Sequence, residues 1–194
     1  AREGADVTIV YLPAEQVDAE TTKKSVEQEK RSCLLVPGDL KDRNVCCRAV
    51  DEHVKKSARV GLLDEQVTDE SLQDGTINIL VNNASKQYIC TEFEKTNLDE
   101  TEDVFRTNII QMMAMAKFAL PHMSRGDSYV LPCLIYIITY SRTFYSIINT
   151  SSVVTFRGSG TMIDYAATKG AIIGFTRSLA KHLIPKGIRV NAVA

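Results

Sequence analysis

The stretch Ile77-Asn78-Ile79-Leu80-Val81-Asn82-Asn83-Ala84-Ser85 joins an apolar run to a group of small and polar residues. A near-continuous apolar run of this length is typical of a strand that is buried on both faces, and the Asn-Asn-Ala-Ser group ends it. Similar short runs recur along the chain, with helical patterns between them. Strands that alternate with helices in this way indicate an α/β fold built on a parallel sheet with helices on both faces.

The same patterns give the expected order of elements along the chain. We predict strands at 7–11, 33–36, 77–81, 146–150 and 188–193. Helices are expected between them at 14–30, 41–57, from Asn97 or Asp99 to 123, and 162–183, with a flexible loop at 158–160. No internal repeat or low-complexity tract occurs, so residues 1–194 are expected to form a single domain.

Composition narrows the class of protein. The 194 residues are 44% hydrophobic and 24% charged, which is typical of a soluble domain with a real core. A formal net charge of -1 gives no reason to expect nucleic acid or a membrane as a partner. The five Cys have no C-x-x-C spacing, and the three His lie far apart. These features predict a cytoplasmic protein with reduced thiols, no secretory signal and no metal site.

The segment Asp164-Tyr165-Ala166-Ala167-Thr168-Lys169-Gly170 carries the first sign of chemistry. Tyr165 and Lys169 are four residues apart in a predicted helix, so they lie on one face. An ammonium beside a phenol favours the phenolate, which makes Tyr165 a usable proton donor or acceptor. The pair alone is weak evidence, because many surface helices contain this spacing by chance.

Other polar residues make the pattern specific. Asn82 to Ser85 follow one strand, and Ser152 follows the next strand, thirteen residues before Tyr165. Ligands of parallel α/β sheets bind at the carboxyl ends of the strands, and Asn108 lies on a helix that could flank this edge. Taken singly, Ser152 could cap a loop, and Asn108 could be a buried polar residue.

This ordered set, with the Arg189-Val190-Asn191 strand, resembles the short-chain dehydrogenase/reductase family. The Pro-Gly-Asp-Leu segment that ends in Leu40 adds a likeness to a subgroup near the glucose dehydrogenases and general-stress oxidoreductases. The resemblance covers most of the chain. It implies a Rossmann-type, doubly wound parallel sheet and hydride transfer between NAD(P) and a carbonyl or alcohol substrate.

The resemblance also implies roles for individual residues. Tyr165 would be the general acid or base, Lys169 would lower its pKa and bind the nicotinamide ribose, and Ser152 would hold the substrate oxygen. Asn108 would anchor a water in the proton relay. The implied cofactor-binding residues, beside Tyr165 and Lys169, are Asp39 and Leu40 near the adenine and Asn82, Asn83 and Ala84 along the nucleotide. Asp39 could instead be a turn former after Pro37-Gly38.

The resemblance is incomplete in two ways. The family's Thr-Gly-x-x-x-Gly-x-Gly turn, whose backbone N–H groups approach the pyrophosphate, does not occur in this sequence. We therefore expect an incomplete sheet that lacks the first, central strand, the glycine-rich loop and the last strand. Two stretches, 57–75 and Tyr129–Tyr145, exceed the family pattern. We hypothesise that the second is translated non-coding sequence, and an exposed β-ribbon or interface patch is the alternative.

Three functions follow from these observations. The first is an NADP- or NAD-dependent oxidoreductase, with a preference for NADP because Tyr11-Leu12-Pro13 occupies the strand tip where NAD enzymes often carry an acidic residue. The second is a catalytically inactive fragment or pseudoenzyme. The third is a nucleotide-sugar epimerase or dehydratase. Family members usually form dimers or tetramers through the two long helices, here 99–123 and 162–183.

Overall fold

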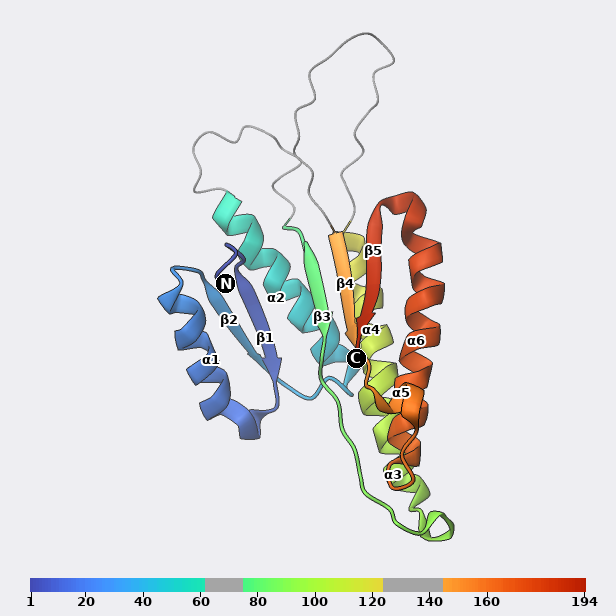
Figure 1. Cartoon of the computed structure of the whole chain (residues 1–194). Helices are drawn as coiled ribbons and strands as arrows, with labels where there is room; N and C mark the ends of the chain where they lie inside the picture. Colours follow the sequence, from blue (N-terminus) through green and yellow to red (C-terminus); the bar gives the residue numbers. More distant parts are fainter. Residues whose placement is uncertain (62–74, 124–144) are drawn as a thin grey trace.

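The computed structural model of the chain describes residues 1–61, 75–123 and 145–194. Parallel strands alternate with helices in these ranges, as predicted (Figure 1). The strands make two sheets, one of the order β1-β2 and one of the order β3-β4-β5. Figure 1 places them side by side as β2, β1, β3, β4, β5, so the order reverses between β1 and β3. This reversal is the switch point of a doubly wound sheet, which confirms the predicted fold class.

The smaller sheet pairs β1 (Val7–Tyr11) with β2 (Cys33–Pro37). The larger sheet consists of β3 (Ile79–Asn82), β4 (Tyr145–Thr150) and β5 (Ile188–Val193). All five predicted strands are present. The third begins two residues later than predicted and extends to Asn82, which continues the ladder by pairing with Asn149 of β4.

The switch point is also where the sheet is open. β1 and β3 form no common ladder among the described residues. Ile79 and Val81 of β3 are 55% and 57% exposed, although both are large and apolar. These two side chains point to one face of the sheet and Leu80 points to the other, so a further helix on that face would cover them, and a strand between β1 and β3 would pair both edges. The expectation that the sheet is incomplete at its centre is therefore confirmed.

Helices pack on these strands and complete the layers. α1 (Gln16–Gln28) follows a 3-10 turn, η1 (Pro13–Glu15), and contacts β1 and β2. α2 (Arg43–Gly61) and α4 (Gln111–Ala119) pack against each other, and both lie behind the strands in the view of Figure 1. α6 (Ile163–Leu183) packs on β5.

The predicted helix from Asn97 to 123 is divided into several parts. α3 (Leu98–Phe105) is followed by a π-helical segment, η4 (Arg106–Ile110), then by α4 and a 3-10 turn, η5 (Leu120–His122). Of the two predicted caps, Asn97 is the one that caps it, because its side chain accepts a hydrogen bond from the Asp99 N–H at 3.0 Å. A short helix, α5 (Val154–Arg157), was not predicted. Further 3-10 turns are η3 (Phe93–Lys95) and η6 (Ile184–Lys186).

The main core lies between the β3-β4-β5 sheet and its helices. Its buried residues come from α2, α4, α6 and the three strands, and they include Val50, Met115, Ala116, Ile147, Leu183 and Ile188. These residues have the spacing expected of strand and helix faces that turn to one core. The packing holds the carboxyl ends of the strands at one edge, the lower edge in Figure 1.

The two extra stretches fall mainly outside the described residues. Residues 62–74 of the first and 129–144 of the second lie outside the described ranges, so the hypothesis of translated non-coding sequence stays a prediction. Tyr145 is the first residue of β4, is 5% exposed and pairs with Ile188. The last residue of the hypothesised segment is thus part of the core strand.

Candidate active site

Tyr165 and Lys169 lie together on α6, as their spacing predicts. The Lys169 ammonium is 5.3 Å from the centre of the Tyr165 ring. Lys169 is only 1% exposed, and its Nζ donates a hydrogen bond of 2.8 Å to the carbonyl oxygen of Thr150, the last residue of β4. Burial lowers the pKa of Lys169 from its ordinary value. A buried cation is therefore held between a strand end and a phenol ring.

The ammonium has unused hydrogen-bonding capacity. A Lys side chain carries three N–H donors, and among the described residues only the Thr150 carbonyl accepts from Lys169. Buried donors are nearly always paired, so this group calls for further acceptors beside Tyr165. Ribose hydroxyl groups are acceptors of the right kind. The arrangement of Lys169 and Tyr165 therefore fits the nicotinamide ribose of a dinucleotide.

The two serines after β4 have different surroundings. Ser151 is buried and its Oγ donates to the Lys169 carbonyl oxygen at 3.1 Å, which ties the strand end to α6. The Ser152 Oγ accepts a long hydrogen bond of 3.4 Å from the Val154 N–H. This contact agrees with the reading of Ser152 as a loop cap. It leaves the Ser152 O–H free to donate to a substrate oxygen, because no described residue accepts it.

Asn108 is fully buried within the π-helical segment, at 0% exposure. Its Oδ1 accepts from the Lys86 N–H at 2.7 Å, and its Nδ2 donates to the Lys86 carbonyl oxygen at 2.9 Å and to Thr168 Oγ1 at 3.0 Å. Thr168 Oγ1 in turn donates to the Tyr165 carbonyl oxygen at 2.7 Å. Both amide hydrogens of Asn108 are thus used, and a water could be bound only through its oxygen atoms.

The residues expected near the adenine lie just after β2. Asp39 accepts a hydrogen bond of 2.9 Å from the Lys41 N–H, which is the contact of a turn-forming Asp. Its side chain is 47% exposed and can take a further donor. Leu40 packs in part against the main core, where its carbonyl oxygen accepts from Cys46 Sγ at 3.1 Å. Both residues lie at the carboxyl edge of the sheet, as expected.

The turn after β3 is fixed at three points. Asn82 Nδ2 donates to Asn149 Oδ1 at 2.9 Å, and Asn83 Oδ1 accepts from Thr150 Oγ1 at 3.0 Å. The Ala84 carbonyl oxygen accepts from Gln111 Nε2 at 3.2 Å. The turn therefore joins β4 and α4 at the same edge as Ser152 and Lys169.

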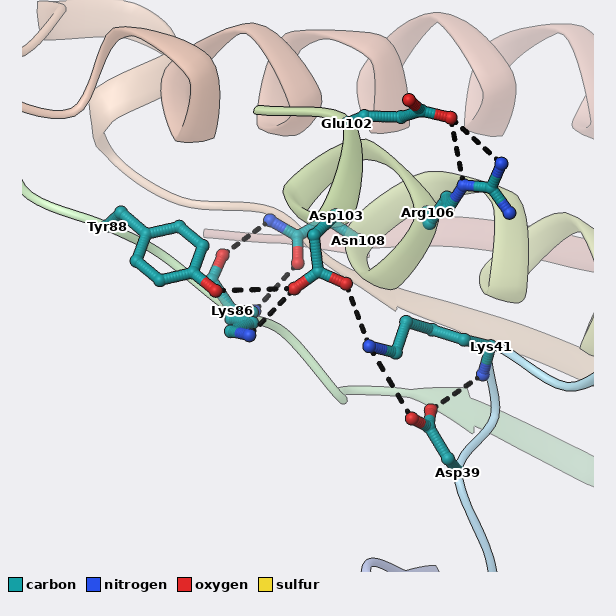
Figure 2. A network of polar contacts seen from close by, with 8 residues as sticks. All are labelled: Asp39, Lys41, Lys86, Tyr88, Glu102, Asp103, Arg106 and Asn108. Carbon is teal, nitrogen blue, oxygen red and sulfur yellow. Dashed lines mark hydrogen bonds and ion pairs between the residues drawn. The ribbon is translucent and has the colours of Figure 1, made fainter. Parts of the chain in front are cut away.

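Sequence reasoning missed an ion-pair bridge beside this site, which Figure 2 shows from close by. Asp103 of α3 accepts from Lys41 Nζ at 2.8 Å and from Lys86 Nζ at 2.7 Å, and Tyr88 Oη lies 3.4 Å from it. Hydrogen bonds from the two ammonium groups lower the pKa of Asp103 to about 2. Lys86 directly follows the Asn-Asn-Ala-Ser group, and this position was the only signal in the sequence.

Two further observations concern other kinds of site. Within 1–61, 75–123 and 145–194, no three His, Cys, Asp or Glu side chains are grouped so that they could hold a metal ion. In the same ranges, no helix has both the length and the apolar character needed to cross a membrane.

Comparison with known proteins identifies the family. A family model described as short chain dehydrogenase matches residues 1–194. The uncharacterized oxidoreductase YhdF of Bacillus subtilis is 42% identical over 194 residues, covering 100% of this chain and 55% of that protein. General stress protein 39 of the same organism is 37% identical over 194 residues, with the same coverage of 100% and 55%. The chain thus spans about half the length of the curated relatives it matches.

A solved structure gives the same result. A short chain dehydrogenase from Burkholderia cenocepacia J2315, in complex with NADP, matches with a TM-score of 0.72 and 26% identity, covering 98% of this chain and 63% of that one. The resemblance inferred from the residues, including its general-stress relatives, is confirmed. The chain belongs to the short-chain dehydrogenase/reductase family.

Proposed function

We propose that the chain acts as an NAD(P)-dependent oxidoreductase that transfers a hydride between the nicotinamide and a carbonyl or alcohol. The observation that carries this proposal is the buried Lys169 ammonium, which lies 5.3 Å from the Tyr165 ring and has donors to spare. A cation held in this place stabilises the phenolate that forms when Tyr165 gives up its proton. The nicotinamide, when bound, supplies or accepts the hydride.

Each residue then has a defined task in carbonyl reduction. Tyr165 donates its phenolic proton to the substrate oxygen, and the Ser152 hydroxyl donates a hydrogen bond to the same oxygen. Lys169 holds the ribose and compensates the charge left on Tyr165. Asn108 holds the backbone of Lys86 and the side-chain hydroxyl of Thr168. An oxygen of Asn108 would bind the water through which the proton of Tyr165 is replaced.

The nucleotide, when bound, would lie along the carboxyl edge of the strands. Asp39 and Leu40 would then contact the adenine, and Asn82, Asn83 and Ala84 would line the path to the nicotinamide. NADP is the preferred cofactor, because no acidic residue occupies the tip formed by Tyr11-Leu12-Pro13. The Burkholderia cenocepacia protein of the same family holds NADP, which supports this preference.

The proposal extends to the domain, the cellular compartment and the oligomeric state in which the reaction takes place. Residues 1–194 act as one dinucleotide-binding domain in the cytoplasm, on a small-molecule substrate. Two or four copies associate through the helical stretch 99–123 and α6. On that stretch, Ile110 of η4 and Met113 of α4 are 45% and 41% exposed. Apolar side chains exposed side by side on a helix are typical of a helix that packs on a partner.

The purified chain tests this proposal directly. NADPH is titrated against it by fluorescence, and NADPH oxidation is followed with a panel of aldehydes and ketones. Saturable binding with turnover supports the oxidoreductase. Saturable binding without net NADPH consumption would point to an epimerase or dehydratase, and no binding would leave the inactive fragment or pseudoenzyme. Either result would overturn the proposal.

A further inference from the structure

Asp103 lies between two loops of the candidate site. Lys41 belongs to the loop after β2 that carries Asp39, and Lys86 belongs to the loop after β3. Asp103 comes from α3 and accepts one short hydrogen bond from each lysine, at 2.8 and 2.7 Å, while Lys41 also reaches Asp39 at 3.5 Å (Figure 2). One carboxylate thus ties two strand-end loops to the helix that leads to Asn108.

The Lys86 end of this bridge leads directly to Asn108. The Asn108 side chain holds both polar groups of the Lys86 main chain, accepting from its N–H at 2.7 Å and donating to its C=O at 2.9 Å. Asp103 holds the side chain of the same residue. Lys86 is therefore fixed from two sides, and each contact limits the motion of the other.

We propose that Asp103 is a positioning residue for Asn108 that acts through Lys86. Without the carboxylate, the Lys86 ammonium loses its hydrogen bond to Asp103. The loop after β3 is then less well ordered, and its hydrogen bonds to the Asn108 amide are weaker. The same amide reaches the main-chain carbonyl oxygen of Tyr165 through the Thr168 hydroxyl, so it is connected to the first turn of α6, which carries the phenol. The consequence for catalysis rests on the proposed function, whereas the effect on Asn108 and Lys86 does not.

The neighbouring ion pair on α3 shows why this carboxylate differs from an ordinary surface charge. Glu102 pairs with Arg106 one helical turn away at 2.8 Å, and both side chains are more than 60% exposed, at 63% and 64%. Exposed ion pairs of this kind contribute little to the free energy of unfolding. The Asp103 side chain is 24% exposed and accepts hydrogen bonds from two lysines. Lys41 is 62 positions and Lys86 is 17 positions from Asp103 in the sequence. Glu102 is therefore a matched control on the same helix.

The test is amide hydrogen exchange measured by NMR on the full chain, read at the Lys86 N–H that Asn108 accepts. Asp103→Asn removes the charge but keeps the shape of the side chain, and Glu102→Gln makes the same change next to it. We expect Lys86 N–H exchange to rise at least about fivefold in Asp103→Asn and to stay within about twofold in Glu102→Gln. Asp103→Glu, which keeps the charge, should restore slow exchange in part.

Salt gives an independent reading in the unaltered chain. Raising the salt concentration from about 0.05 M to about 1 M screens the bridge and should speed exchange at Lys86. Exchange of the Ile77 N–H, which lies before β3 and donates to the His122 carbonyl oxygen at 2.9 Å, serves as the reference. If Asp103→Asn does not fold, the salt dependence of exchange at Lys86 is by itself the test of the inference.

Equal exchange at Lys86 in Asp103→Asn and Glu102→Gln would overturn the inference, as would the absence of a salt effect. Neither measurement requires turnover. A chain that binds no NADPH would therefore contradict the proposed function and leave these two results to decide the role of Asp103.

Discussion

Asn82 and Asn149 are paired both in the strand ladder and through their side chains. Their Cα atoms are in register in the β3-β4 ladder, and the Asn82 amide donates to Asn149 Oδ1 at 2.9 Å. The Asn149 amide continues to Thr176 Oγ1 on α6, also at 2.9 Å. All three side chains are buried. This chain of polar groups sets the register of the strands whose ends carry Asn83 and Ser152, because a shifted strand would leave them unpaired.

Asn149→Ala should destabilise the fold strongly. It leaves the buried Asn82 amide and the Thr176 hydroxyl without partners, and a loss of about 2–5 kcal/mol in the free energy of unfolding is expected. Urea denaturation measures it. Asn191→Ala, on an exposed position of β5, should change the same quantity by less than about 0.5 kcal/mol. Equal effects at the two positions would contradict a register-setting role for Asn149.

The burial of Lys169 should appear in the pH dependence of stability. Its pKa is lowered below 10.5 by burial, so between the lowered value and 10.5 the unfolded chain binds more protons than the folded chain. The contribution of Lys169 to the free energy of unfolding is therefore unfavourable at lower pH and improves as pH rises through this window. The variant Lys169→Met lacks this pH-dependent contribution to the free energy of unfolding.

We thus expect the stability of the unaltered chain, relative to Lys169→Met, to increase as the pH rises toward 10.5. Chemical denaturation at several pH values measures the difference. Lys181→Met changes an exposed lysine of the same helix and should give a difference that is flat with pH. A flat difference for Lys169→Met as well would show that its burial has no energetic consequence.

Tyr165→Phe tests the proposed proton donor. The change removes only the phenolic oxygen, so packing on α6 should be kept. Loss of a general acid typically lowers the rate by about 10²–10⁴. We expect a loss in kcat of this size with NADPH affinity nearly unchanged, measured by NADPH oxidation and by fluorescence titration. A variant that retains full kcat would rule out Tyr165 as the acid.

Gly38→Ala should disturb the loop that carries Asp39 and Leu40. A Cβ at position 38 would lie 2.5 Å from Val45 Cγ1 and 3.0 Å from Val45 Cγ2, and valine has little freedom to move. We expect a loss of about 1–3 kcal/mol in the free energy of unfolding. Gly160→Ala, which has open space around it, is the control. Adding Val45→Ala to Gly38→Ala should recover part of the loss if the clash is the cause.

The elements of the fold were predictable because they depend on local patterns. The apolar run before Asn82 and the one before Ser151 identify strands, and the cap at Asn97 identifies a helix start. The parallel arrangement then places the strand ends at one edge, which brings the neighbourhoods of Asn83 and Thr150 together at 3.0 Å. The pairing of Tyr165 and Lys169 followed from helical spacing alone.

Contacts between distant segments were not predictable in the same way. Lys41 and Asp103 are 62 residues apart, and Asn82 and Asn149 are 67 residues apart, so no local pattern relates them. α5 has only four residues, which is too short to show a helical period. The π-helical segment also has an ordinary helical composition, and only its hydrogen bonding, such as the Gln111 N–H to the Arg106 carbonyl oxygen, reveals it.

That π-helical segment has a consequence for how this helix can change in evolution. A π turn amounts to one residue added to an α-helix, and one residue rotates everything beyond it by about 100°. α3, before the turn, packs on α6, whereas α4, after it, packs on α2. Deleting a single residue between Arg106 and Ile110 would turn Met115 and Ala119 away from the core. The length of this segment is therefore constrained by the packing of the helix beyond it, in addition to the constraint that Asn108 places on its sequence.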